Sequence, residues 1–138
     1  MPATKFVHLS MHTEFSLTDS LVKIKPLMKA LKESGHHAVG VSDATNMFAA
    51  IRFYQQAMAN GIKPIISSEV TVSMPENEGN IVLICRNETG YKNLVKLVSR
   101  AYSEGYKNES EPAKVEFEWL QEASEGLIAL SGDRKSIA

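Results

Sequence analysis

The sequence predicts an α/β fold with mostly parallel strands, in a chain of 138 residues that is long enough for one domain with a core. Short runs rich in Ile and Val alternate with segments whose apolar residues recur every three or four positions, which is typical of strands followed by amphipathic helices. Glycine or proline separates most of these segments. Hydrophobic residues make up 43% of the chain and charged residues 22%, which is ordinary for a globular domain.

Five short, apolar segments are predicted to be strands: residues 5–11, 38–42, 63–73, 80–85 and 126–130. Four segments with apolar residues at helical spacing are predicted to be helices: residues 21–33, 48–60, 90–102 and 117–123. Asp19 and Ser20 are placed to cap the first helix. Pro26 leaves two alternatives, because the helix is either kinked there or begins there with Pro26 in its first turn. The polar residues 106–114 are predicted to be a loop.

Charge and cysteine content exclude several classes of protein. The net charge is −1, so no basic field over the whole chain attracts nucleic acid. No run of about eighteen apolar residues is present, so we expect no membrane span, and the N-terminus does not have the pattern of a signal peptide. Cys85 is the single cysteine and lies in an apolar strand, which favours a buried thiol in a reducing, cytoplasmic compartment.

Histidines at the first strand are the first candidates for chemistry. His8, Ser10 and His12 alternate, so their side chains share one face of a strand. Two imidazoles on one face suggest a metal site, but residues four apart in an extended strand are separated by roughly 13 Å, too far for one ion. Two hydrogen-bonded histidines at the rim of a barrel are the alternative interpretation.

Acidic residues near two further strand ends complete the set of candidates. Asp43 follows a strand and precedes a helix, a position where capping or turn formation explains an aspartate without chemistry. Glu69 lies within an apolar strand, so its carboxylate needs a metal, a cation or an amide as a partner. Because the ends of parallel strands meet at one edge, we expect His12, Asp43 and Glu69 to converge there. The strands near residues 6, 39, 65 and 127 are expected to be adjacent and largely parallel.

Four blocks of sequence resemble one family, in order and at compatible spacing: FVHLSMHTEFSLTDS, GVSDATNMFAAIRFYQQAMANGIKPIISSEVTV, IVLICRNETGYKNLVKLVSRAY and EGLIALSG. They are similar to the N-terminal part of the PHP domain of the bacterial DNA polymerase III alpha subunit. The resemblance implies a distorted (βα)7 barrel. It also implies that residues 1–138 are a truncated part of it, without the remaining strands and the polymerase domains.

The resemblance also implies which positions once held metal. Of the family's ligand positions, His12, Asp19 and Glu69 are retained in this sequence. Three others depart from the pattern, where Ser10 and Ala44 replace histidines and Asp133 replaces a cysteine. His8 and Asp43 are expected to be further residues of the same rim. A polynuclear hydrolytic site depends on each of its ligands, so the resemblance implies a degenerate, proteobacterial-like site that binds no metal and is catalytically inactive.

A barrel without hydrolytic activity still offers a surface. The resemblance implies a scaffold for the rest of the polymerase alpha chain and a docking surface for the proofreading exonuclease (epsilon) subunit. DNA and the catalytic Mg²⁺ of the polymerase are expected to bind outside this fragment, which itself needs no cofactor. An open sheet edge predicts some self-association. The alternatives are an active metal-dependent phosphoesterase of the PHP family and a free-standing interaction module.

Overall fold

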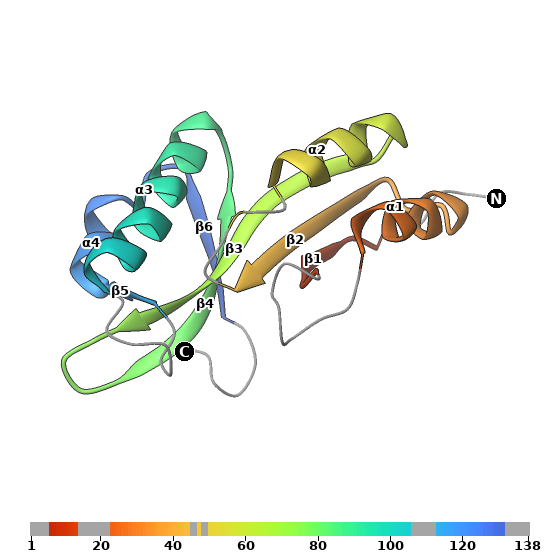
Figure 1. The fold of residues 1–138 in the computed structure, drawn as a ribbon. Helices are drawn as coiled ribbons and strands as arrows, with labels where there is room; N and C mark the ends of the chain where they lie inside the picture. The colour runs from red at the N-terminus through yellow and green to blue at the C-terminus, as the bar shows by residue number, and fades with distance from the viewer. Residues whose placement is uncertain (1–5, 14–22, 45–46, 48–49, 106–112, 132–138) are drawn as a thin grey trace.

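The computed structural model describes residues 6–13, 23–44, 47, 50–105 and 113–131. Strands and helices alternate through the first half of the chain, and a hairpin of two long strands marks the middle (Figure 1). The elements in order are β1 (His8–Met11), α1 (Ile24–Glu33), β2 (Ala38–Ala44), α2 (Ala50–Ala59), β3 (Lys63–Ser73), β4 (Glu78–Cys85), α3 (Glu88–Glu104), β5 (Lys114–Glu116), α4 (Phe117–Glu122) and β6 (Leu127–Ser131).

The strands form one six-stranded sheet in the order β1-β2-β3-β4-β6, with β5 paired to β3. The pairs β1–β2, β2–β3 and β3–β5 are parallel, while β3–β4 and β4–β6 are antiparallel. The predicted α/β class is therefore confirmed. The expected adjacency of the strands near residues 65 and 127 is wrong, because the hairpin partner β4 lies between β3 and β6. A three-residue strand that was not predicted, β5, begins at Lys114, the last residue of the predicted loop.

All four helices pack on one face of this curled sheet. Alternate residues of β3 point to opposite faces, so Val70 and Val72 enter the core under α3 while Glu69 and Thr71 face away from the helices. A second cluster packs α1 and α2 on β2. The helix-free face therefore carries Glu69 and Thr71, whereas the buried Asp43 and Ser68 lie on the helix-covered face.

The first helix begins at Ile24, with Pro26 in its first turn. This confirms the second of the two predicted alternatives, since proline is tolerated where the backbone N–H has no intrahelical partner. The expected caps Asp19 and Ser20 lie outside the described residues. Among the described residues, no helix combines the length and apolar character needed to cross a membrane.

Two glycines hold α3 against the turn before β6. Asn87 caps α3 by accepting a hydrogen bond from the Gly90 N–H at 2.9 Å. Gly126 adopts a left-handed φ of 76°, and its carbonyl oxygen accepts from the Arg86 N–H at 2.8 Å. A Cβ atom on Gly90 would overlap that same carbonyl oxygen. The close approach of the two backbones therefore depends on glycine at position 90.

Replacing Gly90 with alanine should lower the free energy of unfolding by about 1–3 kcal/mol, because backbone atoms have to move to admit the methyl group. Urea denaturation of the chain measures this change. Ser99→Ala, at an exposed position of the same helix, should stay within about 0.5 kcal/mol of the unmodified chain. Equal stability of the Gly90 variant and the control would contradict the close approach.

Candidate functional site

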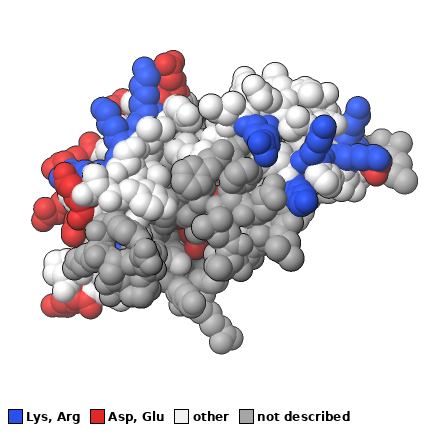
Figure 2. Space-filling model, viewed as in Figure 1, with Lys and Arg blue, Asp and Glu red and all other residues white. Residues whose placement is uncertain are grey.

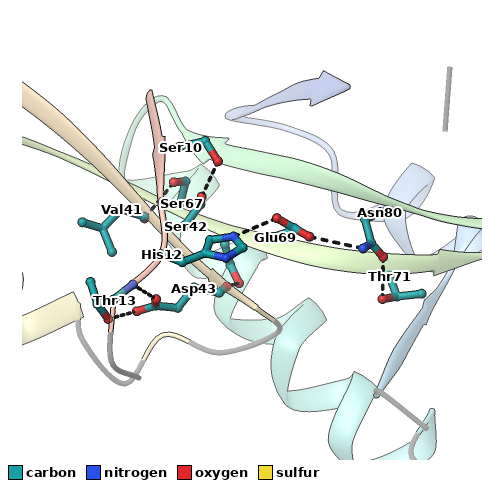
Figure 3. Close-up of polar contacts among 11 residues, drawn as sticks. Ser10, His12, Thr13, Val41, Ser42, Asp43, Ser67, Glu69, Thr71 and Asn80 are labelled. Atoms are coloured by element: carbon teal, nitrogen blue, oxygen red, sulfur yellow. Dashed lines mark hydrogen bonds and ion pairs between the residues drawn. The ribbon is translucent and has the colours of Figure 1, made fainter. Parts of the chain in front are cut away.

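The candidate site lies where β1 and β2 end, beside the middle of β3 (Figure 3). His12 follows β1 directly, and Asp43 is the second-last residue of β2. Ala44 at the end of β2 pairs with Glu69, and β3 continues for four more residues beyond that point. The parallel register of three strands thus brings these residues to one edge, where His12 contacts Glu69. Asp43 alternates with Ala44, so its side chain lies on the opposite face of β2 from Glu69.

Glu69 is the centre of one chain of hydrogen bonds. Its Oε2 lies 2.8 Å from His12 Nε2, and its Oε1 accepts from Asn80 Nδ2 at 3.2 Å. The Asn80 side-chain oxygen in turn accepts from the Thr71 hydroxyl at 2.8 Å. The Glu69 and His12 side chains are 24% and 26% exposed, so water has limited access to them. Both carboxylate oxygens are therefore engaged by side chains of the protein.

Asp43 is more deeply buried, at 2% exposure, and joins the end of β1 to β2. Its two carboxylate oxygens accept from the backbone N–H and the hydroxyl of Thr13, each at 2.6 Å. Its backbone carbonyl accepts from the Ser68 hydroxyl of β3 at 2.9 Å. A buried carboxylate without such donors would be strongly unfavourable. The structure therefore supports a bracing role for Asp43, related to the capping role that the sequence suggested.

Serine hydroxyls form hydrogen bonds between neighbouring strands. The Ser10 and Ser42 hydroxyl oxygens lie 2.7 Å apart, and the Ser67 hydroxyl donates to the carbonyl oxygen of Val41 at 2.8 Å. Ser42 is fully buried. Ser10 occupies a position where a histidine was expected in a metal-binding relative, and here its short side chain forms a cross-strand hydrogen bond.

The structure separates one predicted rim residue from the others. His8 pairs with Val39, near the start of β2, and its ring stacks on the ring of His36 with centroids 5.6 Å apart. Five residues of an extended strand separate Val39 from Ala44, which is about 16 Å. The placement of His8 at the rim was therefore wrong, because His8 lies at the start of β1, beside the start of β2. Asp19 and Asp133 lie outside the described residues.

Sequence reasoning did not identify Thr13, Thr71 or Asn80 as partners of the site. Thr71 and Asn80 are directly opposite each other in the β3–β4 hairpin, on the same face as Glu69. The polar turn between the two strands predicts the hairpin, and counting back from it would have placed these residues in register. Nothing in the sequence near Thr13 indicates its contact with Asp43, thirty residues away.

The described donor set does not fit a polynuclear metal centre. Within the residues that the structure describes, no three His, Cys, Asp or Glu side chains lie close enough together to hold an ion. One imidazole and one carboxylate, His12 and Glu69, are in contact, whereas a structural zinc site has four protein ligands and a catalytic one has three. The Asp43 oxygens already accept two short hydrogen bonds from Thr13.

Cys85, at the end of β4, is not arranged as a nucleophile. Partial burial raises the pKa of its thiol to about 11. Because the thiolate is the reactive form, the folded chain keeps this cysteine in its unreactive state near neutral pH. This agrees with the apolar strand in which the sequence places it.

Comparisons with known proteins agree with this fold. The family model described as "PHP domain" matches residues 8–137. A DNA polymerase III subunit alpha of Pseudomonas aeruginosa is 45% identical over 133 residues, which cover 94% of this chain and 11% of that protein. The corresponding protein of Pseudomonas fluorescens is 46% identical over 138 residues, which cover 98% of this chain and 12% of that protein. The chain thus spans about a tenth of the length of the curated relatives it matches.

A solved structure shares the fold at much lower sequence identity. It is described as an amidohydrolase from Chromobacterium violaceum and superposes with a TM-score of 0.51 at 16% identity. The match covers 72% of this chain and 37% of the other. The likeness concerns the arrangement of strands and helices.

Replacing Glu69 with alanine should lower the free energy of unfolding by about 1–3 kcal/mol, because His12 and Asn80 lose their shared acceptor. Glu76→Ala, which removes an exposed glutamate from the turn of the same hairpin, should change stability by less than about 0.5 kcal/mol. Chemical denaturation of both variants measures the difference. Equal losses of unfolding free energy in the two variants would contradict the hydrogen bonds of Glu69 to His12 and Asn80.

Alkylation of Cys85 by iodoacetamide at pH 8 should be about 100-fold slower in the folded chain than in urea, since burial raises the pKa of this thiol to about 11. The rate in the folded chain should rise as the pH approaches that pKa. Mass spectrometry of the modified cysteine gives both rates. Alkylation of the folded chain at the unfolded rate would show an accessible, ordinary thiol.

Proposed function

The chain belongs to the PHP domain family, and from this premise we propose that it is the PHP region of a DNA polymerase III alpha subunit, the polymerase of chromosomal replication. Support comes from the identity of 45–46% to two such subunits over nearly the whole chain. Nucleotide addition then takes place in other domains, which bind most of the DNA and the Mg²⁺. A cytoplasmic location follows from that role.

Within the polymerase, we propose that this domain is an inactive scaffold. The observation that carries the proposal is the engagement of Glu69, whose two carboxylate oxygens are held by His12 and Asn80. A metal-bridging carboxylate needs its oxygens directed at the ions, and a hydrolytic site needs imidazoles that orient the metal and its water. Here Ser10 bonds to Ser42, and Ala44 supplies no donor group.

An inactive PHP domain leaves the polymerase without a hydrolytic site of its own for removing mismatched nucleotides. We therefore propose that the domain provides a docking surface for a separate proofreading exonuclease, the epsilon subunit. Gel filtration of the purified alpha and epsilon subunits tests this pairing. Loss of the complex on deletion of the PHP domain is expected, and an undiminished complex would contradict it.

Self-association of the chain in isolation is a further part of the proposal. β1 and β6 are the two ends of the main strand order in the described sheet, and each leaves one row of backbone groups without a described strand partner. Ile128 on β6 is 46% exposed. Sedimentation of the dilute chain as a monomer would argue against association through these edges.

The metal content of the chain tests the inactive site. Purified without chelators, it should contain clearly less than one equivalent of zinc, manganese and iron, because too few donor side chains remain. Ser10→His combined with Ala44→His should raise the affinity for Zn²⁺ or Mn²⁺ in a titration. Ser99→His, which adds an imidazole on the exposed side of α3, should not.

The competing function is that of an active phosphoesterase. One tightly bound ion per chain, together with hydrolysis of bis(p-nitrophenyl) phosphate that disappears in Glu69→Ala, would establish that activity and end the scaffold proposal. Circular dichroism of each variant has to show an unchanged fold for the comparison to count.

A further inference from the structure

Helix α2 presents apolar side chains on two sides. Phe53 and Ala57 are fully buried in the core between α1, α2 and β2. Ile51, Tyr54 and Met58 remain 71%, 49% and 57% exposed. At about 100° per residue, the two groups together cover an arc of about 160°, wider than the stripe of about 100° that a surface helix needs for its own core. The excess predicts a surface that something else covers.

A hollow of about 320 Å³ lies beside the exposed apolar side of α2. Ile51 and Tyr54 form its wall on α2, Tyr91 faces them from α3, and Ile66 of β3 lies between the helices. This lining is suited to one or two aliphatic or aromatic side chains of a bound molecule.

The opposite side of α2 borders a basic groove. A second hollow, of about 510 Å³, is lined by Lys23, Lys25 and Pro26 at the start of α1 and by Arg52, Gln55 and Gln56 of α2. Gln55 belongs to both hollows, so they adjoin each other across α2. Lysine and arginine atoms predominate over the α1 end of the molecule in Figure 2, whereas acidic and basic atoms are mixed over the α3 and α4 end.

The lysines of α1 differ from three of the five basic residues described in the second half of the chain. Three basic residues in the second half form ion pairs with glutamates: Lys92 with Glu88 at 3.0 Å, Arg100 with Glu104 at 2.8 Å and Lys114 with Glu78 at 2.8 Å. By contrast, no ion pair to another described residue is formed by Lys23 or by any of the lysines of α1, Lys25, Lys29 and Lys32. Residues 23–63 contain six Lys and Arg residues but only two acidic residues, Glu33 and the buried Asp43. This end is therefore complementary to a negatively charged ligand.

We propose that α2, with the hollow on each side, binds an acidic amphipathic segment of a partner protein. The apolar side chains of that segment enter the hollow between α2 and α3, and its carboxylates face Lys23 and Lys25 across α2. This is the geometry of a helix laid in a groove, with a charged flank that sets its orientation. The proposal does not depend on the pairing with an exonuclease subunit, to which no surface is assigned.

Two other occupants fit the surface less well. Single-stranded nucleic acid needs aromatic rings set along a basic track, but here the tyrosines and the lysines lie on opposite sides of α2, in a chain of net charge −1. A second copy would have to offer its acidic end, where Glu88 and Glu104 of α3 are already paired with basic neighbours. The exposed Glu118 and Glu122 remain, but they lie on α4, a helix of only six residues that is short for a groove. A longer acidic segment from another protein avoids both difficulties.

Fluorescence anisotropy with the purified chain tests the proposal. The probe is a labelled peptide with leucines spaced three and four residues apart and glutamates elsewhere, compared with a peptide of the same composition in scrambled order. Ile51→Ala combined with Tyr54→Ala should weaken binding about tenfold. Lys23→Glu combined with Lys25→Glu should weaken it by a similar factor and reduce its salt dependence. All four positions are exposed, so folding should be retained.

Matched controls lie outside the lining of both hollows. Lys96→Glu on α3 and Phe117→Ala on α4 change an exposed lysine and an exposed aromatic residue, and both should leave binding unchanged. Amide NMR shifts caused by the peptide should concentrate in residues 23–26 and 50–58. Absence of binding, equal binding of the scrambled peptide, or insensitivity to both pairs of substitutions would overturn the proposal. Tighter binding of oligo-dT, or dimerisation that Ile51→Ala abolishes, would overturn it in favour of nucleic acid or a second copy.

Discussion

The register of β3 is the constraint on which the rest of the structure depends. This strand of 11 residues pairs with β2, β4 and β5, so no part of it can shift without breaking several ladders. Its alternation sends Val70 and Val72 into the helix-covered core and leaves Glu69 and Thr71 on the other face. The position of the polar cluster therefore follows from the packing of the core.

The carboxylates at this edge of the sheet need hydrogen-bond donors because water has limited access to them. Glu69 finds them in His12 and Asn80, and Asp43 finds them in Thr13. In a metal-binding domain a cation would balance such carboxylates, whereas here imidazole, amide and hydroxyl donors do so. Both carboxylates are therefore satisfied by donors within the described part of the protein.

The sequence predicted most of the fold because the strands and helices are marked by strong apolar periodicity. It missed β5, since Lys114–Glu116 is three residues long and carries charge at both ends. It predicted that His12, Asp43 and Glu69 lie at one edge of the sheet, because strand order and strand ends suffice for that. It did not predict that Asp43 and Glu69 lie on opposite faces. It misplaced His8, and it did not find Asn80 and Thr71, because both depend on the register between strands, which local patterns do not determine.

The ¹⁵N chemical shift of His12 Nε2 during a titration with Zn²⁺ tests the central claim most directly. This nitrogen lies 2.8 Å from a Glu69 carboxylate oxygen, so it is already engaged by a partner within the protein. The account predicts that its signal stays unchanged after one equivalent of Zn²⁺. A change of the His12 Nε2 signal to that of a metal-bound imidazole, complete at one equivalent, would contradict it.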